Sequence, residues 1–281
     1  MAKFIRMFKK ISTYTPTVGE SWIMFVCVVI CGSVLATPTT HPFVKDIPAI
    51  SQFLAYLLTL APAFVYAYLK GKRGQYSPKR KINESHFGKM NPILMFIMLP
   101  VIMAAFLFFI DPAAALFTTP EWFKDAVISE SFFWTSMTTC VCAPLIEELL
   151  CRGIMLRGMV EKGVSPAKAI FWSALIFGVI HMNPWQAIPA FLMGLLFGWL
   201  YYKTGNLWIT IILHFLNNAT SIVTYYFYPE LAEAGSFKEM IGNDQIYFPI
   251  YAISVAVVAL SYFIISKYVG RRDEQETVIS A

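Results

Sequence analysis

Long apolar runs without a charged side chain constrain this chain more than any other feature. The run NPILMFIMLPVIMAAFLFFI covers residues 91–110, and a helix needs about 20 apolar residues to cross a hydrocarbon core of about 30 Å. The chain is 57% hydrophobic and only 14% charged, whereas about a quarter of a soluble domain is charged. The sequence therefore predicts an all-α, polytopic membrane helix bundle.

Eight apolar segments predict eight transmembrane helices that surround an intramembrane polar cavity. Their approximate bounds are 21–37, 50–69, 92–110, 131–150, 167–182, 186–202, 206–227 and 246–268. Among the 22 Lys and Arg residues, all but Lys45, Lys124 and Lys238 fall on the side of the N-terminus. Because basic loops remain in the cytoplasm, we expect a multi-pass protein of the cell membrane with both termini cytoplasmic.

We expect residues 1–281 to form a single membrane domain, because the sequence shows no linker, repeat or low-complexity tract. Residues 1–20 form a basic, amphipathic segment that we expect to lie on the membrane surface near anionic lipid. The five cysteines lie in or beside predicted spans and are interpreted as buried small hydrophobic residues. The net charge of +5 does not indicate nucleic-acid binding, since membrane topology explains where the basic residues lie.

A few polar residues interrupt these apolar runs. The stretch PLIEELLCRG at 144–153 contains two glutamates and an arginine, and His181 and His214 fall in other predicted spans, while His41 and His86 fall in loops. A charged side chain in hydrocarbon costs several kcal/mol unless it is paired or faces water. We therefore interpret the set as a functional site. Its members are Glu147, Glu148, Arg152, His181, His214, Asn217 and Asn218.

Helix periodicity separates the two glutamates. Glu148 and Arg152 are four residues apart, so they share a helix face and can form an ion pair. Glu147 is rotated by about 100° from Glu148 around the helix axis, so it need not share Arg152 and is available to another partner. The loop at 161–163 predicts that this helix continues to about Val160.

The same periodicity sorts the other polar residues. Phe177 lies one helical turn before His181, and Asn218 lies one turn after His214, so each pair shares a face, whereas Asn217 points elsewhere. At a rise of 1.5 Å per residue, Glu147 and His181 lie roughly 20 Å along their helices, and His214 and Asn218 lie roughly 12 Å and 18 Å along theirs. These depths are similar. We therefore expect them to meet in one cavity.

The residue types in this set fit hydrolysis. A buried carboxylate beside an imidazole suits the activation of water, and a histidine and an asparagine on one helix face suit stabilisation of an oxyanion. Two histidines and a glutamate are also the usual ligands of a catalytic zinc ion. A zinc site formed by Glu147, His181 and His214 is therefore the competing interpretation. The sequence contains no HExxH, Walker, GxSxG or CxxC motif.

Three ordered motifs resemble a known family. EELLCR at 147–152 matches EExxxR, FGVIH at 177–181 matches FxxxH, and HFLNN at 214–218 matches HxxxN. In this order they resemble the CAAX protease and bacteriocin-processing (CPBP/Abi) family of intramembrane endopeptidases, which includes the prenyl-protein endopeptidases. The resemblance covers about residues 140–225, and we expect the catalytic core to span about 131–227.

The resemblance implies that the chain is a peptide hydrolase acting on a membrane-associated peptide or protein. It implies that Glu147 activates the attacking water with the assistance of His181, and that His214 and Asn218 stabilise the oxyanion. Three further motif residues would maintain the charge balance and packing of the cavity. These residues are Glu148, Arg152 and Phe177.

The family has been labelled metalloprotease, and a metal-free glutamate mechanism is also argued for it. We expect no cofactor, because Asn218 is a poor zinc ligand and no third histidine is available in the predicted spans, with zinc as the alternative. The short loops are typical of a bacterial member, and bacterial relatives are linked to bacteriocin or pheromone maturation, immunity and surface-protein regulation. A non-catalytic scaffold or bacteriocin-immunity protein of the same fold is the alternative function. A channel is disfavoured, because the outer halves of these helices show no continuous polar path.

Overall fold

The computed structural model confirms the all-α expectation, because the residues that it describes contain helices and no strand. The described residues are 2–37, 48–74, 76–128 and 131–270. Four residues used in the charge and histidine argument lie outside this part of the chain. They are His41, Lys45, Arg271 and Arg272.

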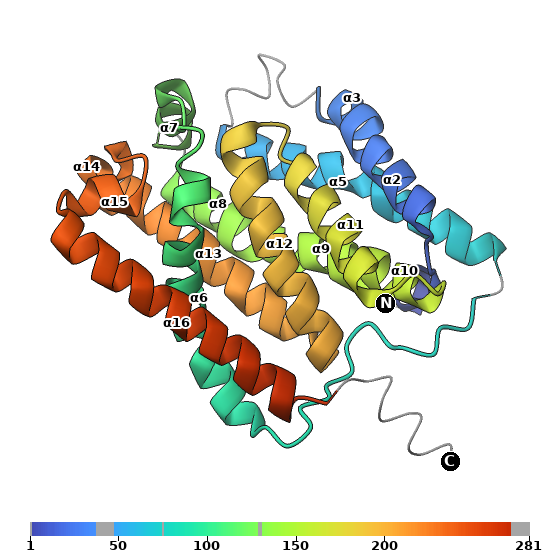
Figure 1. The fold of residues 1–281 in the computed structure, drawn as a ribbon. Coiled ribbons are helices and arrows are strands. Elements are labelled where there is room, and N and C mark those ends of the chain that lie inside the picture. The colour runs from blue at the N-terminus through green and yellow to red at the C-terminus, as the bar shows by residue number, and fades with distance from the viewer. Residues whose placement is uncertain (1, 38–47, 75, 129–130, 271–281) are drawn as a thin grey trace.

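A long segment connects α5 to α6 (Figure 1). The helices are α1 (Ala2–Thr13), α2 (Val18–Val26), η1 (Cys27–Gly32), α3 (Ser33–Ala36), α5 (Pro48–Arg73), α6 (Pro92–Ala114), α7 (Glu121–Ile128), α8 (Phe132–Ser136), η3 (Met137–Cys142), α9 (Ala143–Glu148), η4 (Leu149–Leu156), α10 (Arg157–Glu161), α11 (Pro166–Val179), α12 (Pro184–Thr204), α13 (Leu207–Phe227), α14 (Pro229–Glu233), α15 (Phe237–Ile241) and α16 (Asp244–Tyr268).

Five helices in the described part of the chain are long and apolar enough to cross a membrane. They are Val18–Ala36, Phe53–Arg73, Pro92–Ala114, Leu207–Phe227 and Asp244–Tyr268. The other three predicted spans are also helical, but α11 is a shorter apolar helix of 14 residues. The count of eight spans and the single domain over 1–281 therefore stay predictions.

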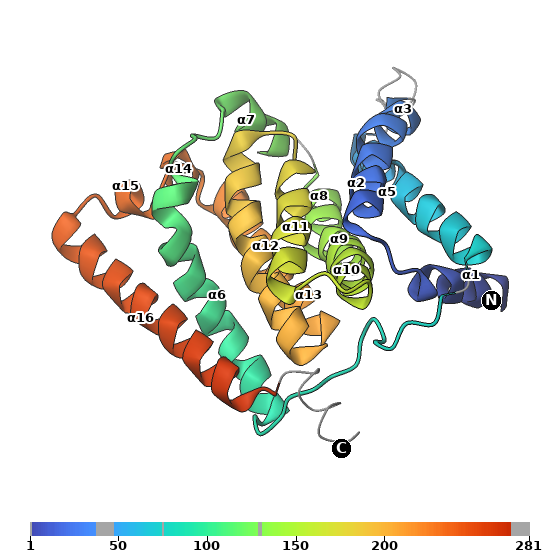
Figure 2. The same ribbon diagram turned by 45° about the vertical axis from the view of Figure 1, so that its right-hand side comes forward.

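The helices present two distinct ends (Figure 2). α7, α14 and α15 lie together at one end, which we call the α7 end, whereas α1 and the segment 76–91 lie at the other, which we call the α1 end. Hydrogen bonds fix the start of α13 at the α1 end, since Asn83 Oδ1 accepts from Leu207 N at 2.8 Å. The far end of α13 contacts α7 and α14.

One continuous helical stretch carries the first motif. It runs without a break from α8 to α10, and α9 lies between two π-helical stretches, η3 and η4. The wider π-helical turn often occurs where a helix forms a functional site, because it changes the angles at which side chains leave the helix. The stretch ends at Glu161, so the prediction that it continues to about Val160 is confirmed.

The turn between α11 and α12 corrects the expectation for His181. α11 ends at Val179, so His181 lies in the turn beyond the helix rather than within a span. Asn183 caps α12 by accepting a hydrogen bond from Gln186 N at 2.9 Å, and Pro184 is the first residue of α12. An asparagine cap followed by proline ends one helix and begins another, and this signal in HMNPW places the histidine in the turn.

Two apolar clusters form the interior on either side of the site. One joins α1, α2 and α5 to η4 and α11, and the other joins α6, α12, α13 and α16. Phe177 belongs to the first cluster and Phe197 to the second. The motif residues therefore lie where the two clusters meet.

Arg157 fixes the chain entering α2 onto the site-bearing helix. Its side chain is buried, and its guanidinium donates to the carbonyl oxygens of Ser12 at 2.8 Å and Tyr14 at 3.0 Å. Hydrogen bonds from a charged donor are among the stronger ones. The N-terminal helix α1 is thereby attached to the end of the stretch that contains Glu147, while its location on a membrane surface stays a prediction.

Candidate active site

A buried ion pair lies at the centre of the first motif. Arg152 Nη1 lies 2.8 Å from Glu148 Oε1, and both side chains are 0% exposed. The pairing that the four-residue spacing allowed is present. Removing two charges from water carries a large free-energy cost, which strong pairing and further hydrogen bonds have to offset.

Arg152 is held by groups from three other positions. Its Nη2 donates to the carbonyl oxygen of Gly194 at 3.3 Å. Its guanidinium lies over the ring of Phe177, 4.4 Å from the centroid, and 5.4 Å from that of Phe197. Cation–π contacts of this kind strengthen when they are shielded from water, so α9, α11 and α12 are connected through one side chain.

His214 lies between the two glutamates. Its Nδ1 is 3.1 Å from Glu148 Oε1, and its Nε2 is 4.0 Å from Glu147 Oε2. Because a carboxylate oxygen accepts hydrogen bonds, Nδ1 carries a proton in this arrangement and Nε2 is directed toward Glu147. The two glutamates therefore meet at opposite sides of one imidazole, although they leave their helix on different faces.

Glu147 has a partner that sequence reasoning missed. The hydroxyl of Tyr56, on α5, donates to Glu147 Oε1 at 3.0 Å, and the Glu147 side chain is 12% exposed. Tyr56 lies in an apolar run and carries no charge, so neither spacing nor composition distinguishes it among the 14 tyrosines. The expected partner was His181, whereas the contacts found for Glu147 are Tyr56 and His214.

His181 is oriented by the turn that contains it. Its Nδ1 lies 2.9 Å from the carbonyl oxygen of Phe177, which can only accept, so Nδ1 carries the proton and Nε2 is left with a lone pair. The side chain of Asn183 donates to the carbonyl of His181 at 2.8 Å, and Met182 adopts a φ of 58°. A non-glycine residue in this left-handed region is strained and is often found at functional sites.

The ring of Phe177 separates and supports both histidines. Its centroid lies 5.5 Å from that of His181 and 5.4 Å from that of His214, with the rings nearly perpendicular in each pair. The contact of Phe177 with His181 agrees with the one-turn spacing in the sequence. The contact with His214, on α13, was not expected.

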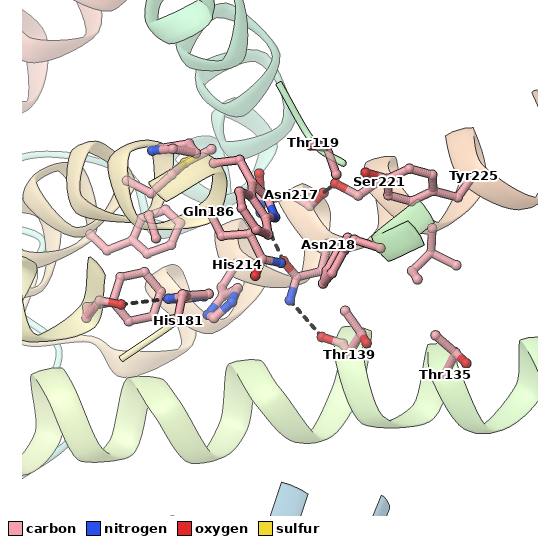
Figure 3. Close-up of a pocket in the computed structure, with 18 residues that line it drawn as sticks. Thr119, Thr135, Thr139, His181, Gln186, His214, Asn217, Asn218, Ser221 and Tyr225 are labelled. Atoms are coloured by element: carbon pink, nitrogen blue, oxygen red, sulfur yellow. Dashed lines mark hydrogen bonds between the residues drawn. The ribbon is translucent and has the colours of Figure 1, made fainter. Parts of the chain in front are cut away.

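Asn218 is fixed by two hydrogen bonds (Figure 3). Its Nδ2 donates to the carbonyl oxygen of Thr139 at 2.7 Å, and its Oδ1 accepts from Asn217 Nδ2 at 2.9 Å. One N–H of the Asn218 amide remains for another acceptor. The expectation that Asn217 points elsewhere was wrong, because it bonds to Asn218 and lines the same cavity.

These residues line a cavity of about 320 Å³ (Figure 3). Its polar lining consists of Thr119, Thr135, Thr139, His181, Gln186, His214, Asn217, Asn218, Ser221 and Tyr225. Glu147 and Glu148 are not among the lining residues, and they reach the cavity through His214. The volume is at the lower end of the range for ligand pockets, and its position within a membrane stays a prediction.

The residues proposed as zinc ligands do not form a ligand set. Among the residues that the structure describes, no three His, Cys, Asp or Glu side chains are close enough together to hold a metal ion. Glu147, His181 and His214 therefore do not fit the competing zinc site in this arrangement, and no chemical step below is routed through a metal.

Comparison with known proteins agrees with the three motifs. Residues 129–220 match the family model described as Rce1-like, the type II CAAX prenyl endopeptidases. The match covers one segment of the chain, from the start of the first motif helix to the middle of α13. The resemblance recognised from EExxxR, FxxxH and HxxxN is thereby confirmed, and all three motifs lie within the matched residues. No curated protein and no solved structure matched the chain.

The matched segment contains every motif residue, but it does not contain the whole site. Tyr56 lies outside it, as does Thr119 at the wall of the cavity. The structure brings Glu147, Glu148 and His214 into contact, and it brings His181 and Asn218 to the same cavity. Their individual catalytic roles stay predictions.

We predict that Arg152→Gln lowers the free energy of unfolding by about 3–5 kcal/mol, because it leaves the buried Glu148 carboxylate without its cation. The measurement is thermal unfolding of the detergent-purified protein. Lys168→Gln, which removes an exposed cation from the same region, should change little. The double variant Glu148→Gln with Arg152→Gln should recover part of the loss, and a double variant less stable than Arg152→Gln would contradict this account.

Proposed function

We propose that this protein is an intramembrane endopeptidase that hydrolyses a peptide bond in a membrane-associated peptide or protein. The supporting observation is His214, which contacts Glu148, faces Glu147 and lines a cavity shared with His181 and Asn218. The arrangement lies in the segment that matches the Rce1-like model, which is described as type II CAAX prenyl endopeptidase. A carboxylate and an imidazole directed at one point are suited to general-base chemistry.

Glu147 acts as the base in this proposal. The gap of 4.0 Å between Glu147 Oε2 and His214 Nε2 is too long for a direct hydrogen bond, but one water can contact both atoms. As the oxygen of that water attacks the carbonyl carbon, Glu147 takes its proton. The C–N bond then breaks and the proton passes from Glu147 to the leaving nitrogen. One water is consumed to give a carboxylic acid and an amine, which ionise to a carboxylate and an ammonium group.

The negative charge on the carbonyl oxygen requires donors that are already in place. Asn218 supplies the amide N–H that is left after its bond to Thr139. His214 supplies a second donor when both of its ring nitrogens are protonated between the two glutamates. His181 presents Nε2 to the same cavity, where it assists proton transfer.

Glu148, Arg152 and Phe177 act as positioning residues. Glu148 fixes the orientation of His214 by accepting from Nδ1, and Arg152 neutralises Glu148. Phe177 packs against both histidine rings and the guanidinium. Tyr56 orients Glu147 through its hydroxyl.

The multi-pass arrangement belongs to this proposal too. Five helices are long and apolar enough to cross a membrane, and the three other apolar segments complete the eight spans with both termini in the cytoplasm. A bacterial cell membrane and a role in peptide maturation, immunity or surface-protein regulation agree with the short loops. The proposal requires no metal.

We predict that Glu147→Gln abolishes peptide cleavage while the protein still accumulates in the membrane, because glutamine cannot take the proton from water. The measurement is a quantitative comparison by mass spectrometry of membrane and secreted peptides from the wild-type and Glu147→Gln strains. Glu230→Gln, on the exposed helix α14, is the matched control and should retain the wild-type pattern.

The alternative is a non-catalytic scaffold or bacteriocin-immunity protein with the same fold. It requires that Glu147→Gln and His181→Ala both leave the peptide pattern and the cellular phenotype of the wild type unchanged. That result would overturn the protease proposal.

We predict that Tyr56→Phe slows product accumulation about tenfold, equivalent to about 1.4 kcal/mol in the activation free energy, since Glu147 loses the donor that orients it. Tyr68→Phe removes a hydroxyl elsewhere on α5 and is the matched control. The rate of appearance of the products identified above is the measurement. Equal rates for Tyr56→Phe and wild type would show that the hydroxyl does not position Glu147.

We predict that prolonged dialysis against a strong chelator leaves the cleavage rate of the purified protein unchanged. The probe is a substrate peptide identified in the strain comparison, and metal content is measured on the same sample. Loss of cleavage that added zinc restores would instead support the metalloprotease alternative.

A further inference from the structure

The cavity extends from the motif residues toward the α7 end. Along α13 its lining begins at His214 and continues to Tyr225, a distance of about 16 Å at 1.5 Å per residue. The inner part is closed by Phe177, Phe197 and His214, which are all buried. Ser221, toward the other end, is exposed.

Elements of the α7 end form the mouth of the cavity. Thr119 and Phe123 line it, and Trp185 at the start of α12 contacts both Trp122 and Phe123, with ring centroids 6.1 Å apart in each pair. Figure 3 shows Thr119, Ser221 and Tyr225 on the side of the cavity away from His181. The mouth therefore lies beside α7.

The α1 end of the site is closed by packing and by the ion pair. Arg152 and Glu148 are fully buried, and so are Leu150 and Ile154 on the same helical stretch and Leu200 on α12. A polypeptide that approached from the α1 end would have to separate the Arg152–Glu148 pair, and breaking a buried pair is strongly unfavourable.

The two ends also differ in charge. The α1 end carries many lysines and arginines, among them Lys9, Lys10, Lys70, Lys72, Arg73, Lys79, Arg80, Lys81, Lys89 and Lys162. The basic residues described at the α7 end are Lys124 and Lys238. Each is paired with an acid, Lys124 with Glu121 at 2.9 Å and Lys238 with Asp244 at 3.3 Å. Since an excess of Lys and Arg marks the cytoplasmic side, the mouth of the cavity opens away from the cytoplasm.

We propose that the substrate enters this cavity from the non-cytoplasmic side of the membrane, so that the protein cleaves a polypeptide segment that has been exported. This inference rests on the proposed endopeptidase function and names its substrate class. It restricts the substrate to peptides and proteins whose scissile segment reaches the outer part of the membrane.

The lining also indicates the chemistry of that segment. Apart from the two histidines, its polar residues are neutral hydroxyls and amides, such as Thr135, Gln186, Asn217 and Ser221. Neutral donors and acceptors satisfy the N–H and C=O groups of an extended peptide, whereas a charged side chain would enter without an opposite charge. The favoured occupant is therefore an uncharged, extended segment of the exported polypeptide.

The test is cysteine labelling with a membrane-impermeant, sulfonated maleimide. Thr119→Cys and Ser221→Cys place thiols at the mouth, and Lys81→Cys places one at the α1 end, where the Lys81 side chain is 80% exposed. Each variant is made in a Cys31→Ser background, because Cys31 is exposed, contrary to the expectation that all five cysteines are buried. That background provides the blank. Intact cells and inside-out vesicles are labelled separately.

We expect both mouth cysteines to react in intact cells and Lys81→Cys to react only in inside-out vesicles. Mouth cysteines that react only in inside-out vesicles would overturn the proposal. The proposal would also be overturned if the mouth cysteines stay unlabelled in detergent while Lys81→Cys is labelled. That result would show that the cavity has no open mouth.

Labelling does not require cleavage, so it separates this inference from the proposed function. If Glu147→Gln leaves the peptide pattern unchanged but the mouth is labelled from outside, the protease proposal fails and the orientation of the cavity stands. If cleavage depends on Glu147 but the mouth is labelled only from the cytoplasm, the exported-substrate inference alone fails.

Discussion

The buried Glu148–Arg152 ion pair is the interaction on which the rest of the site depends. Through Arg152 it holds Phe177, Phe197 and the Gly194 carbonyl, and through Glu148 it holds His214. These partners help to offset the desolvation of both charges. The pair thus connects four separate stretches of the chain, and its geometry sets the position of the imidazole that faces Glu147.

Sequence reasoning succeeded where one helix contained the whole interaction. The spacing of Glu148 and Arg152 predicted their pair, and the loop after Val160 predicted the length of their helix. It failed where the interaction joins helices whose rotation about their axes is unknown. The contact of Tyr56 with Glu147 depends on how α5 packs, which no periodicity within α5 reveals.

Two further differences have local causes. His181 was expected inside a span because the apolar run continues to it, but the cap at Asn183 and Pro184 ends the helix two residues earlier. Glu147 and Glu148 were separated because they lie about 100° apart on a helix. They meet because His214 has two nitrogens on opposite sides of its ring and accommodates one carboxylate at each.

The shortness of α11 has a consequence for the surrounding lipid. Its 14 residues extend about 21 Å, whereas the hydrocarbon core of a bilayer is about 30 Å thick. A hydrophobic element shorter than the bilayer is accommodated by local thinning. In the proposed membrane arrangement, the bilayer beside α11 would be thinner near the turn of His181. Water would then reach the cavity across a thinner layer than elsewhere around the protein.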